Sequence, residues 1–326
     1  MPQTNNKIRI GLLGCSDVAI RRFLPALMKT DKALLSAVAS RDPEKARLFA
    51  PGLEYAVLTY DELLSDERVD LVYLSLPNHL HEEWTIKALM QGKHVICEKP
   101  LACSSVDVAK MVMCARERGL LLYENIMYLH HPQHALIRDL IAAGEIGCIR
   151  ILRAAFGFHL AGADNFREHP EKGGGAFFDL FRYPLSSALY FLDDNFIDCR
   201  GFSLYRKGLQ VGMHGCAVTA ENTLFDFSIG FEQQYECFYE IVGERGTIRL
   251  ERAYTTPPDY ENLIQMTIGA KRATIPVPPA DHFERMLAFV CDTIAGGKSF
   301  EALHISAERL ALVAHWMKVA CKDVHI

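Results

Sequence analysis

Short apolar runs alternate with longer amphipathic stretches through the first part of the chain. Runs of four to seven residues rich in Val, Ile and Leu are typical of buried strands. The stretches between them repeat apolar side chains every three or four residues, as helices do. Strands that alternate with helices in this way predict a parallel, doubly wound sheet. The predicted strands are Lys7–Leu13, Leu34–Ala39, Asp70–Leu76, His94–Cys97 and Leu120–Tyr123.

The helices between these strands have recognisable ends. One helix passes through Leu24, Leu27 and Met28, and another ends at Met90. A third is capped by Ser104 or Ser105 and runs to Arg118, where Gly119 stops it.

Beyond residue 126 the pattern changes to strand-like stretches, which can pair antiparallel with their neighbours along the chain. A helix ending near Gly144 precedes them. This pattern predicts an α+β second domain on a largely antiparallel sheet. Such a sheet needs its outer face covered, which favours pairing with another subunit. The strands are Cys148–His159, Ile197–Tyr205, Thr223–Phe231, Tyr235–Val242 and Thr247–Arg252; the helices are Ala176–Leu192, His282–Ala295 and Ser306–Cys321.

Composition narrows the class of protein. The 326 residues are 50% apolar, and the net charge of −5 comes without a long basic run, so nucleic acid is not an expected partner. No stretch of about 18 apolar residues predicts a membrane span. The polar start lacks the pattern of a signal peptide. Ten scattered cysteines without a C-x-x-C pair indicate a reducing, cytoplasmic location and no disulfide frame.

The turn after the first strand is a candidate phosphate-binding turn. The dinucleotide fingerprint is G-x-G-x-x-G/A, and here Gly14 and Ala19 take its first and last positions. Ser16 replaces the middle glycine and adds a hydroxyl that can itself bind phosphate. The alternative is an ordinary turn between a strand and a helix.

The second strand ends in Ser40-Arg41, where an NAD enzyme usually offers an acidic side chain to the ribose hydroxyls. Asp42 comes too late to serve. A hydroxyl and a guanidinium suit a 2′-phosphate, so the pair favours NADP over NAD. The alternative is a surface arginine that begins a loop before Pro43.

The apolar strand at residues 94–97 ends abruptly in Glu98-Lys99-Pro100. Pro100 cannot donate to a sheet, and it biases Lys99 toward an extended conformation. A lysine is therefore held at the carboxyl end of a strand, where open α/β sheets bind ligands. The alternative is a solvated turn.

Five motifs occur in order along the chain: Gly14-Cys15-x-Asp17-x-Ala19, Ser40-Arg41, Pro77-Asn78-x-x-His81, Glu98-Lys99-Pro100 and Gly173-Gly-Gly-Ala-Phe-Phe-Asp179-x-x-x-Tyr183. With these motifs almost the whole chain resembles the glucose–fructose oxidoreductase / inositol dehydrogenase (Gfo/Idh/MocA) family. Within that family it is most similar to sugar-nucleotide 3-ketoreductases of deoxysugar biosynthesis. The narrower resemblance rests on Glu124-Asn125, on His130-His131-Pro132-Gln133-His134, on Val242-Gly-Glu-Arg-Gly246 and on Glu251-Arg252-Ala253-Tyr254.

The resemblance implies a catalytic pair. Lys99 matches the family lysine that polarises the reacting carbonyl, and Tyr183 matches the second catalytic position. Dehydrogenases of the family usually carry His at that position. A tyrosine, with a pKa of about 10, is normally protonated and can donate a proton, which favours reduction of a ketone by NADPH. Lys99 as the proton donor remains an alternative, and Tyr183 as a packing aromatic is another.

The family pattern also differs at Phe181, where a small residue is usual, so a bulky ring can reshape the nicotinamide pocket. Three histidines in residues 130–134 suggest a metal, but Pro132 interrupts the local helix and no carboxylate lies within the cluster, so no metal is expected. The resemblance instead places this segment in the substrate pocket.

By the resemblance, residues 1–126 form an NADP-binding Rossmann domain and residues 127–326 a substrate-binding and oligomerisation domain. A homodimer or homotetramer through the second sheet is expected. The expected cofactor residues are Gly14, Cys15, Ser16, Asp17, Val18, Ala19, Ser40, Arg41, Tyr60, Leu76, Asn78, His81, Glu98, Arg167 and Asp179. The expected substrate residues are Arg21, Lys99, Asn125, His131, Tyr183 and Tyr235.

The expected reaction is reduction of the C3 ketone of a dTDP-linked 3,4-diketo-deoxyhexose. A family oxidoreductase acting on a free sugar, an inositol or a dihydrodiol is the alternative. A regulator that senses NADP without chemistry is a third possibility, and the presence of both Lys99 and Tyr183 argues against it.

Overall fold

The structure is a computed structural model that describes residues 7–160, 165–192, 195–297 and 299–326. The chain forms two compact units. Unit 1 contains residues 1–125 and 283–308, and unit 2 contains residues 126–282 and 309–326.

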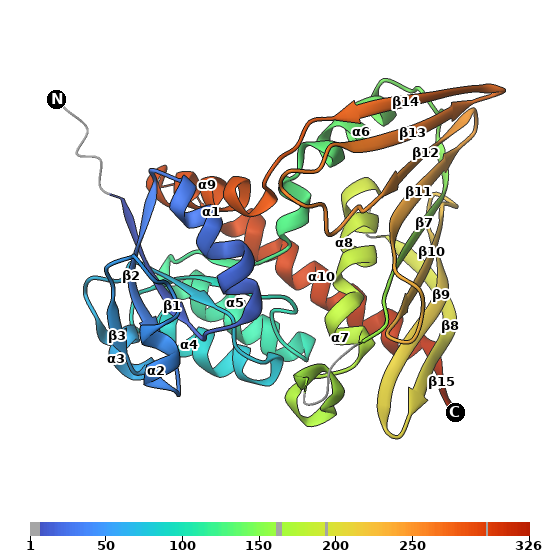
Figure 1. The fold of residues 1–326 in the computed structure, drawn as a ribbon. Coiled ribbons are helices and arrows are strands. Elements are labelled where there is room, and N and C mark those ends of the chain that lie inside the picture. The colour runs from blue at the N-terminus through green and yellow to red at the C-terminus, as the bar shows by residue number, and fades with distance from the viewer. Residues whose placement is uncertain (1–6, 161–164, 193–194, 298) are drawn as a thin grey trace. The chain divides into compact units, whose positions relative to one another are not determined.

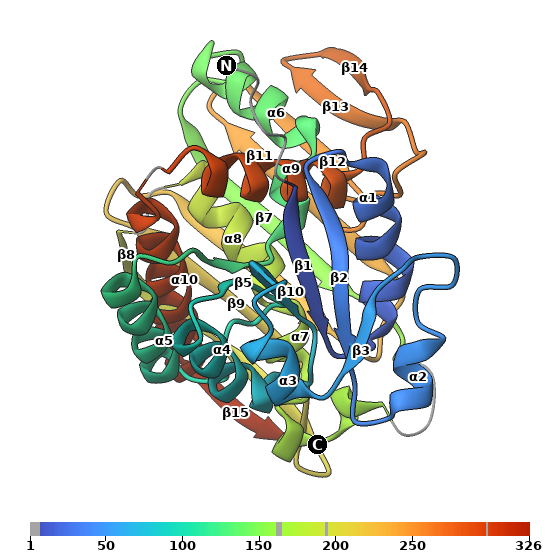
Figure 2. The same ribbon diagram turned by 90° about the vertical axis from the view of Figure 1, so that its left-hand side faces the viewer.

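Unit 1 is built on a six-stranded sheet in which every neighbouring pair is parallel, in the order β3-β2-β1-β4-β5-β6. Figure 2 shows β1, β2 and β3 of this sheet side by side. The order reverses direction at the β1–β4 pair, the position at which doubly wound sheets bind ligands. The strands are β1 (Ile8–Leu13), β2 (Ala33–Ala39), β3 (Ala56–Leu58), β4 (Leu71–Leu74), β5 (His94–Cys97) and β6 (Leu122–Glu124).

Helices connect these strands, and the side-chain caps explain where several of them begin and end. The Ser104 hydroxyl accepts the Asp107 amide at 3.3 Å, and Gly119 ends the same helix in a left-handed conformation, as predicted. The helices of unit 1 are η1 (Ala19–Phe23), α1 (Leu24–Lys29), α2 (Pro43–Arg47), α3 (Tyr60–Ser65), η2 (Asn78–Leu80), α4 (His81–Met90), α5 (Ser105–Arg118) and α9 (His282–Ala295), with the start of α10 (Glu301–Ala320).

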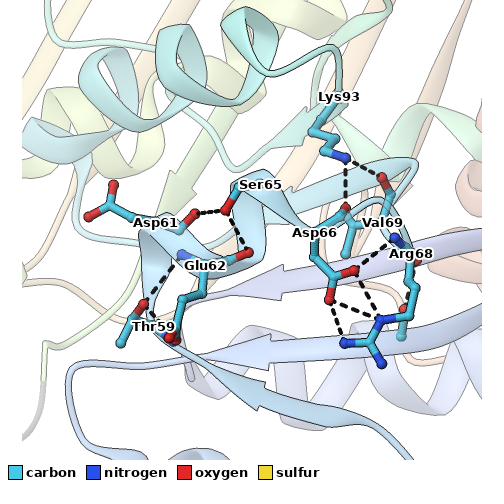
Figure 3. Close-up of polar contacts among 9 residues, drawn as sticks. Thr59, Asp61, Glu62, Ser65, Asp66, Arg68, Val69 and Lys93 are labelled. Carbon is cyan, nitrogen blue, oxygen red and sulfur yellow. Dashed lines mark hydrogen bonds and ion pairs between the residues drawn. The ribbon is translucent and has the colours of Figure 1, made fainter.

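The connection from α3 to β4 is fixed by polar contacts (Figure 3). Thr59 and Glu62 form a capping box at the start of α3. Asp66 accepts hydrogen bonds from the backbone and the guanidinium of Arg68. The buried Lys93 ammonium donates to the carbonyls of Asp66 and Val69, each at 2.8 Å. Two loops at the amino ends of the strands are thereby joined.

Unit 2 contains a nine-stranded sheet, and helices α6, α7 and α8 pack on its strands (Figure 1). The strands are β7 (Ile149–Gly157), β8 (Phe196–Arg206), β9 (Leu209–Thr219), β10 (Leu224–Gly230), β11 (Glu236–Gly243), β12 (Gly246–Glu251), β13 (Asn262–Ile268), β14 (Lys271–Val277) and β15 (Cys321–His325). The helices are η3 (Met127–His130), α6 (Pro132–Ala142), η4 (Phe166–Glu168), η5 (Pro170–Lys172), α7 (Ala176–Leu180) and α8 (Arg182–Phe191), with the rest of α10.

The prediction of a largely antiparallel sheet in unit 2 is confirmed, but not every strand pairs with its neighbour along the chain. The order β14-β13-β12-β11-β7-β10-β9-β8-β15 is mostly antiparallel, but β7 pairs with β10 and β8 pairs with β15 in parallel. The reason is topological: the chain leaves β7 through α7 and α8 and returns three places along the sheet, so β7 and β8 are not neighbours.

The predicted helix Ala176–Leu192 is wrong as a single helix, because α7 and α8 meet at Phe181. Pro184 lacks the amide that would bond to the carbonyl of Leu180, which explains a break at this place. Similarly, Pro25 lies at the junction of η1, a π-helical turn, with α1. Among the described residues, no helix has both the length and the apolar character needed to cross a bilayer.

Candidate active site

In unit 1, many of the predicted site residues follow the carboxyl ends of parallel strands. Gly14 follows β1, Ser40 follows β2, Leu76 follows β4 and Lys99 follows β5, while Asn125 follows β6. Because the strands are parallel, these ends share one edge of the sheet. The fold therefore gathers at this edge residues from five separate segments.

The turn after β1 requires glycine. Gly14 has a φ of +104°, and a Cβ atom there would lie 2.8 Å from Cδ2 of Leu76 and 3.1 Å from the carbonyl oxygen of Ser75. The amide of Gly14 donates to the carbonyl of Ala39 at 3.0 Å, which ties the turn to the end of β2. The Ser16 hydroxyl oxygen accepts the Ala19 amide at 3.2 Å. Ser16 therefore shapes the turn as well as offering its hydroxyl.

Exposed charges flank this turn. Arg21 and Asp17 form an ion pair at 3.4 Å, with side chains that are 75% and 84% exposed. A pair this exposed contributes little to stability, so both groups can change partners at small cost.

The end of β2 brings four predicted residues together. Burial raises the pKa of the Cys15 thiol, and its side-chain hydrogen bond with Ser40 opposes that rise. Burial also raises the pKa of Tyr60, and the neighbouring Arg41 opposes that shift. Asp42 is engaged elsewhere, since its carboxylate accepts the amides of Glu44 and Lys45 and caps α2.

Lys99 follows a carboxyl group that is fixed by hydrogen bonds. Glu98 is buried, and its Oε1 accepts the Tyr73 hydroxyl and the Asn125 side-chain amide, each at 2.6 Å. Burial raises the pKa of Glu98, while these two donors and Lys99 oppose the rise. The Tyr73 ring stacks on Phe23 at 3.8 Å. Asn125 is fully buried, and its Oδ1 has no hydrogen-bond partner among the described residues.

His81 and Glu124 hold the backbone after Lys99. The His81 ring is fully buried, with Nδ1 2.8 Å from the Pro100 carbonyl and Nε2 2.8 Å from the Leu76 carbonyl. Burial lowers the pKa of His81, and a neutral ring donates to only one of these carbonyls at a time. The Leu101 amide donates to the Glu124 carboxylate at 3.0 Å. Both ring nitrogens of His81 therefore face backbone carbonyls, one of which belongs to the residue after Lys99.

In unit 2, the glycines before Tyr183 make room for a close approach of backbone. A Cβ atom on Gly174 would lie 2.6 Å from the Arg167 carbonyl, and Gly175 has a φ of +106°. The Arg167 guanidinium is 2.7 Å from the buried carboxylate of Asp179. The two predicted cofactor residues of this unit are therefore paired with each other.

Tyr183 is held in a cluster of aromatic rings. Its side chain is nearly buried, and the ring of Phe156 meets it edge-on at 4.9 Å, with Tyr254 at 5.5 Å and Tyr128 at 5.8 Å. The Tyr128 hydroxyl donates to the backbone carbonyl of Tyr183 at 3.2 Å. Phe181, the family departure, is fully buried in the core of unit 2, with its ring 5.0 Å from Phe227.

Two histidines of residues 130–134 make described polar contacts within unit 2. His131 Nδ1 accepts the Gln133 amide at 3.3 Å and caps α6, while His134 Nδ1 lies 2.9 Å from the Tyr239 hydroxyl. Burial lowers the pKa of His134 strongly. The described residues contain no cluster of three His, Cys, Asp or Glu side chains suited to a metal.

Tyr235 is half-exposed, and its hydroxyl is 2.5 Å from the Thr255 hydroxyl. Burial raises its pKa to about 12, so the phenol stays protonated. The Arg252 guanidinium lies 5.8 Å from the Tyr235 ring and 5.4 Å from the Tyr260 ring. Neither Arg252 nor Tyr260 is a predicted site residue; Arg252 belongs to the motif Glu251-Arg252-Ala253-Tyr254, and no motif contains Tyr260.

Tyr73, Tyr128 and Glu124 also support predicted residues without being predicted themselves. Tyr73 lies inside an apolar strand, where the sequence gives no reason to expect a functional hydroxyl. Glu124 belongs to the motif Glu124-Asn125, whereas the contacts of Tyr73 and Tyr128 are tertiary and no local pattern predicts them.

Comparisons with known proteins agree with this arrangement. The model of the oxidoreductase family with an NAD-binding Rossmann fold matches residues 8–126, and that of the GFO/IDH/MocA C-terminal domain matches residues 134–249. The chain is 37% identical to the dTDP-3,4-didehydro-2,6-dideoxy-alpha-D-glucose 3-reductase of Saccharopolyspora spinosa over 89% of this chain and 88% of that protein. Its identity to the Actinomadura kijaniata enzyme of the same name is 32%, over 99% of this chain and 98% of that protein.

A solved 3-ketoreductase from Actinomadura kijaniata, in complex with NADP and TDP-benzene, superimposes with a TM-score of 0.95. It is 31% identical and matches 98% of this chain and 100% of that one. Further structures of that enzyme carry a replacement of one lysine or of one tyrosine. With both family models matched and relatives this similar over nearly their whole length, the chain belongs to the Gfo/Idh/MocA family of oxidoreductases.

Proposed function

We propose that this protein is an NADPH-dependent reductase of the C3 ketone of a dTDP-linked deoxy keto-sugar. The observation that carries the proposal is the fixed setting of Lys99, whose neighbours on both sides are held by buried side chains of three other segments. Relatives at 32–37% identity share one activity of this kind, which supports the choice of substrate class.

The residues at the carboxyl edge of the sheet fit NADP. The turn that begins at Gly14 joins the carboxyl end of β1 to the helical segment at Ala19, which is where a Rossmann fold binds the pyrophosphate of a dinucleotide. Arg41 beside Tyr60 offers a guanidinium for a 2′-phosphate. Asp42 is occupied in capping α2, so the acidic contact to ribose hydroxyls that favours NAD is missing. When bound, the cofactor supplies the hydride.

We assign Lys99 and Tyr183 to the same carbonyl group, on the strength of the two-residue pattern of the family that both match. The Lys99 ammonium donates a hydrogen bond to the ketone oxygen and stabilises the negative charge that grows on it. The Tyr183 hydroxyl gives its proton to that oxygen as the carbon gains the hydride. The products are a 3-hydroxy-4-keto sugar nucleotide and NADP⁺.

The remaining predicted residues are proposed to bind substrate and cofactor. Asn125 is proposed to accept a hydrogen bond from a hydroxyl or an amide, which its buried Oδ1 without a donor among the described residues supports. The half-exposed Tyr235 ring can stack on the base of the nucleotide. Arg21 is proposed to meet the diphosphate. His81 is reassigned from a cofactor contact to a positioning residue, since both ring nitrogens face backbone carbonyls.

The test is NADPH oxidation with purified protein against dTDP-linked keto-sugars, free sugars and inositols. We expect turnover with a dTDP-linked 3-keto sugar, and turnover only with free sugars or inositols would overturn the substrate assignment. Lys99→Ala should lower kcat/KM about 10²–10³-fold, as loss of an oxyanion donor does. Tyr183→Phe should lower kcat about 10²–10⁴-fold with little change in KM.

Two matched variants serve as controls. Lys87→Ala removes an exposed ammonium paired with Glu83, and Tyr205→Phe removes a phenol hydroxyl of β8; neither should change kcat/KM. If Tyr183→Phe keeps full activity while Lys99→Ala is inactive, Lys99 delivers the proton instead. Full activity in both variants contradicts the catalytic assignment.

We also propose that the protein acts in a reducing compartment, the cytoplasm, because all ten cysteines are free thiols. The exposed apolar side chains of β8 support assembly of a homodimer or homotetramer through the sheet of unit 2.

A further inference from the structure

A cavity of about 500 Å³ lies within unit 1 at the edge of the sheet opposite to Lys99. His94, the first residue of β5, lines it together with Gly119, which precedes β6. Phe300 and His304, at the start of α10, complete the wall. Because these positions mark the amino ends of parallel strands, the cavity is separate from the candidate active site at their carboxyl ends.

His304 is the feature that points to a ligand. Its side chain is 2% exposed, yet neither ring nitrogen has a hydrogen-bond partner among the described residues. Native proteins rarely leave such groups unpaired, since each costs free energy that a partner would restore. Burial and Arg116 lower the pKa of His304, while Glu301 and the nearby Leu120 carbonyl oppose the shift. A neutral ring offers one acceptor nitrogen and one donor.

The charges around the cavity favour a cation. Arg116 bridges two carboxylates, with its guanidinium 2.8 Å from Glu301, which lines the cavity, and 2.8 Å from Glu308, which lies behind that lining, so among the described residues of this cluster one positive charge faces two negative ones. Helix α5 ends at Gly119, and α9 ends just before Gly297, which also lines the cavity. Helix carboxyl ends carry partial negative charge. The amino end of α10 is covered in part, because Ser299 accepts the Glu301 amide at 3.2 Å.

One wall of the cavity is apolar. The Phe300 ring and Ile294 line it, and the His94 ring meets Phe300 edge-on at 5.7 Å. His94 Nδ1 accepts the Leu121 amide at 2.9 Å, so the proton of a neutral His94 ring is on Nε2. An aromatic face beside negative groups suits an ammonium on an apolar stem.

We propose that this cavity is a second binding site, for a small organic ammonium ion carried on an apolar or aromatic stem. The ammonium donates a hydrogen bond to the acceptor nitrogen of His304 and is balanced by Glu301 and Glu308. The stem packs on Phe300 and Ile294. The site does not depend on the proposed reductase activity, because it uses none of the residues assigned to that activity.

The probe is benzylamine, which is a cation at neutral pH, with benzyl alcohol and benzoate as neutral and anionic controls of similar shape. Binding is measured by calorimetry on the full chain with saturating NADPH present. We expect benzylammonium to bind and to raise the Tm, and the two controls to bind at least tenfold more weakly. Equal binding of all three compounds, or no binding of benzylammonium at millimolar concentration, would overturn the proposal.

His304→Phe fills the same space without polar atoms. We expect it to weaken benzylammonium at least tenfold and to raise the Tm of the ligand-free protein, because two unpaired buried nitrogens are removed. The control is His315→Phe, an exposed position on the same helix, which should change neither value. Should His304→Phe fail to fold, Glu308→Gln offers the second test, with weaker binding of the amine and unchanged binding of the alcohol. Unaltered amine binding in either folded variant contradicts the proposal.

Discussion

Arg41 and Asp42 are adjacent, yet the structure gives them different tasks. Asp42 closes the first turn of α2 with its carboxylate, which leaves it without a role toward a ribose. Arg41 lies beside Tyr60, at the edge where the turn after β1 also ends. We therefore propose that Arg41, and not Asp42, determines the preference for NADP, because the Asp42 carboxylate is used to cap α2.

Arg41→Ala should raise the KM for NADPH about 10- to 100-fold, because a charge-assisted hydrogen bond to phosphate is worth about 1.5–3 kcal/mol. The KM for NADH should stay nearly constant, since NADH lacks the 2′-phosphate. Steady-state kinetics with both cofactors measure this. Arg47→Ala, an exposed arginine paired with Glu44, is the control. Equal changes for both cofactors would contradict the assignment.

Asp66 offers a prediction of pH dependence. Hydrogen bonds from the Arg68 side chain, and then from its backbone, lower the pKa of this carboxyl from 3.8 to about 2. A carboxyl group with a depressed pKa in the folded state stabilises the protein at pH values above its pKa in the unfolded chain, which is about 3.9. This stabilisation is lost as the pH falls toward 2.

Asp66→Asn should therefore cost about 1 kcal/mol at pH 7, a value reduced for the solvent around Arg68, and the difference should vanish near pH 2. Urea unfolding at several pH values measures it. Glu67→Gln, an exposed neighbour, should show no such trend. A cost for Asp66→Asn that is the same at pH 2 and pH 7 would be inconsistent with this account.

At the scale of elements, local pattern predicts unit 1 better than unit 2. Strands β1, β2, β4 and β5 are nearly continuous apolar runs, and their predictions are confirmed. Strand β13 alternates apolar and polar residues, β14 is mostly exposed and β15 has one buried residue, so they read as surface segments until their partners are known. The parallel β7–β10 pair depends on a long crossover that no window of sequence contains.

The candidate site divides in the same way. Gly14, Ser40, Arg41 and Lys99 could be found because each follows a strand in a recognisable motif. Tyr73 could not, because its hydroxyl acts on Glu98 from another strand, 25 residues away in the chain. Sequence motifs mainly reveal the residues proposed to contact ligands. The residues that position them come together only when the chain folds, so no motif reveals those.

Two glycines allow a matched test of the turn after β1. Gly14→Ala should cost about 2–4 kcal/mol, from a strained φ and from contact with Leu76, and should raise the KM for NADPH. Gly92 also has a positive φ, +73°, but nothing lies within 4 Å of an added Cβ. Gly92→Ala should cost about 1 kcal/mol and leave KM unchanged. Urea unfolding and kinetics separate strain from crowding; equal costs would refute the role of contact.

The whole molecule presents an exposed row of side chains on the sheet of unit 2. Phe202, His214 and Ser228 lie side by side across β8, β9 and β10, and Phe202 is 54% exposed. A cavity of about 650 Å³ lies over this row, with Leu204 and Val324 in its lining. An apolar surface of this kind is expected to be covered by another protein surface.

We propose that copies of the protein assemble through this face; Phe202→Glu should then yield monomers, because a buried carboxylate without a partner is costly at an interface. Light scattering after size-exclusion chromatography gives the mass. Met28→Glu places the same charge on an exposed apolar position of unit 1 and should leave the mass unchanged. A monomeric wild-type protein, or an unaltered mass for Phe202→Glu, would refute assembly through this face.

Residues 283–308 belong to unit 1. Because synthesis starts at the amino end, the ribosome adds them only after residues 126–282 of unit 2. The Phe289 ring lies 6.2 Å from Tyr123 on the edge strand β6, and Asp292 pairs with Lys32 at 2.5 Å. At about 5–20 residues per second, the ribosome needs on the order of 10–30 s to add residues 126–282. During that interval the edge strand β6 of the nascent protein lacks its contact with α9, because α9 has not yet been translated. A pause in translation before residue 283 would prolong this incomplete state, whereas unit 2 lacks only the short segment that follows residue 308.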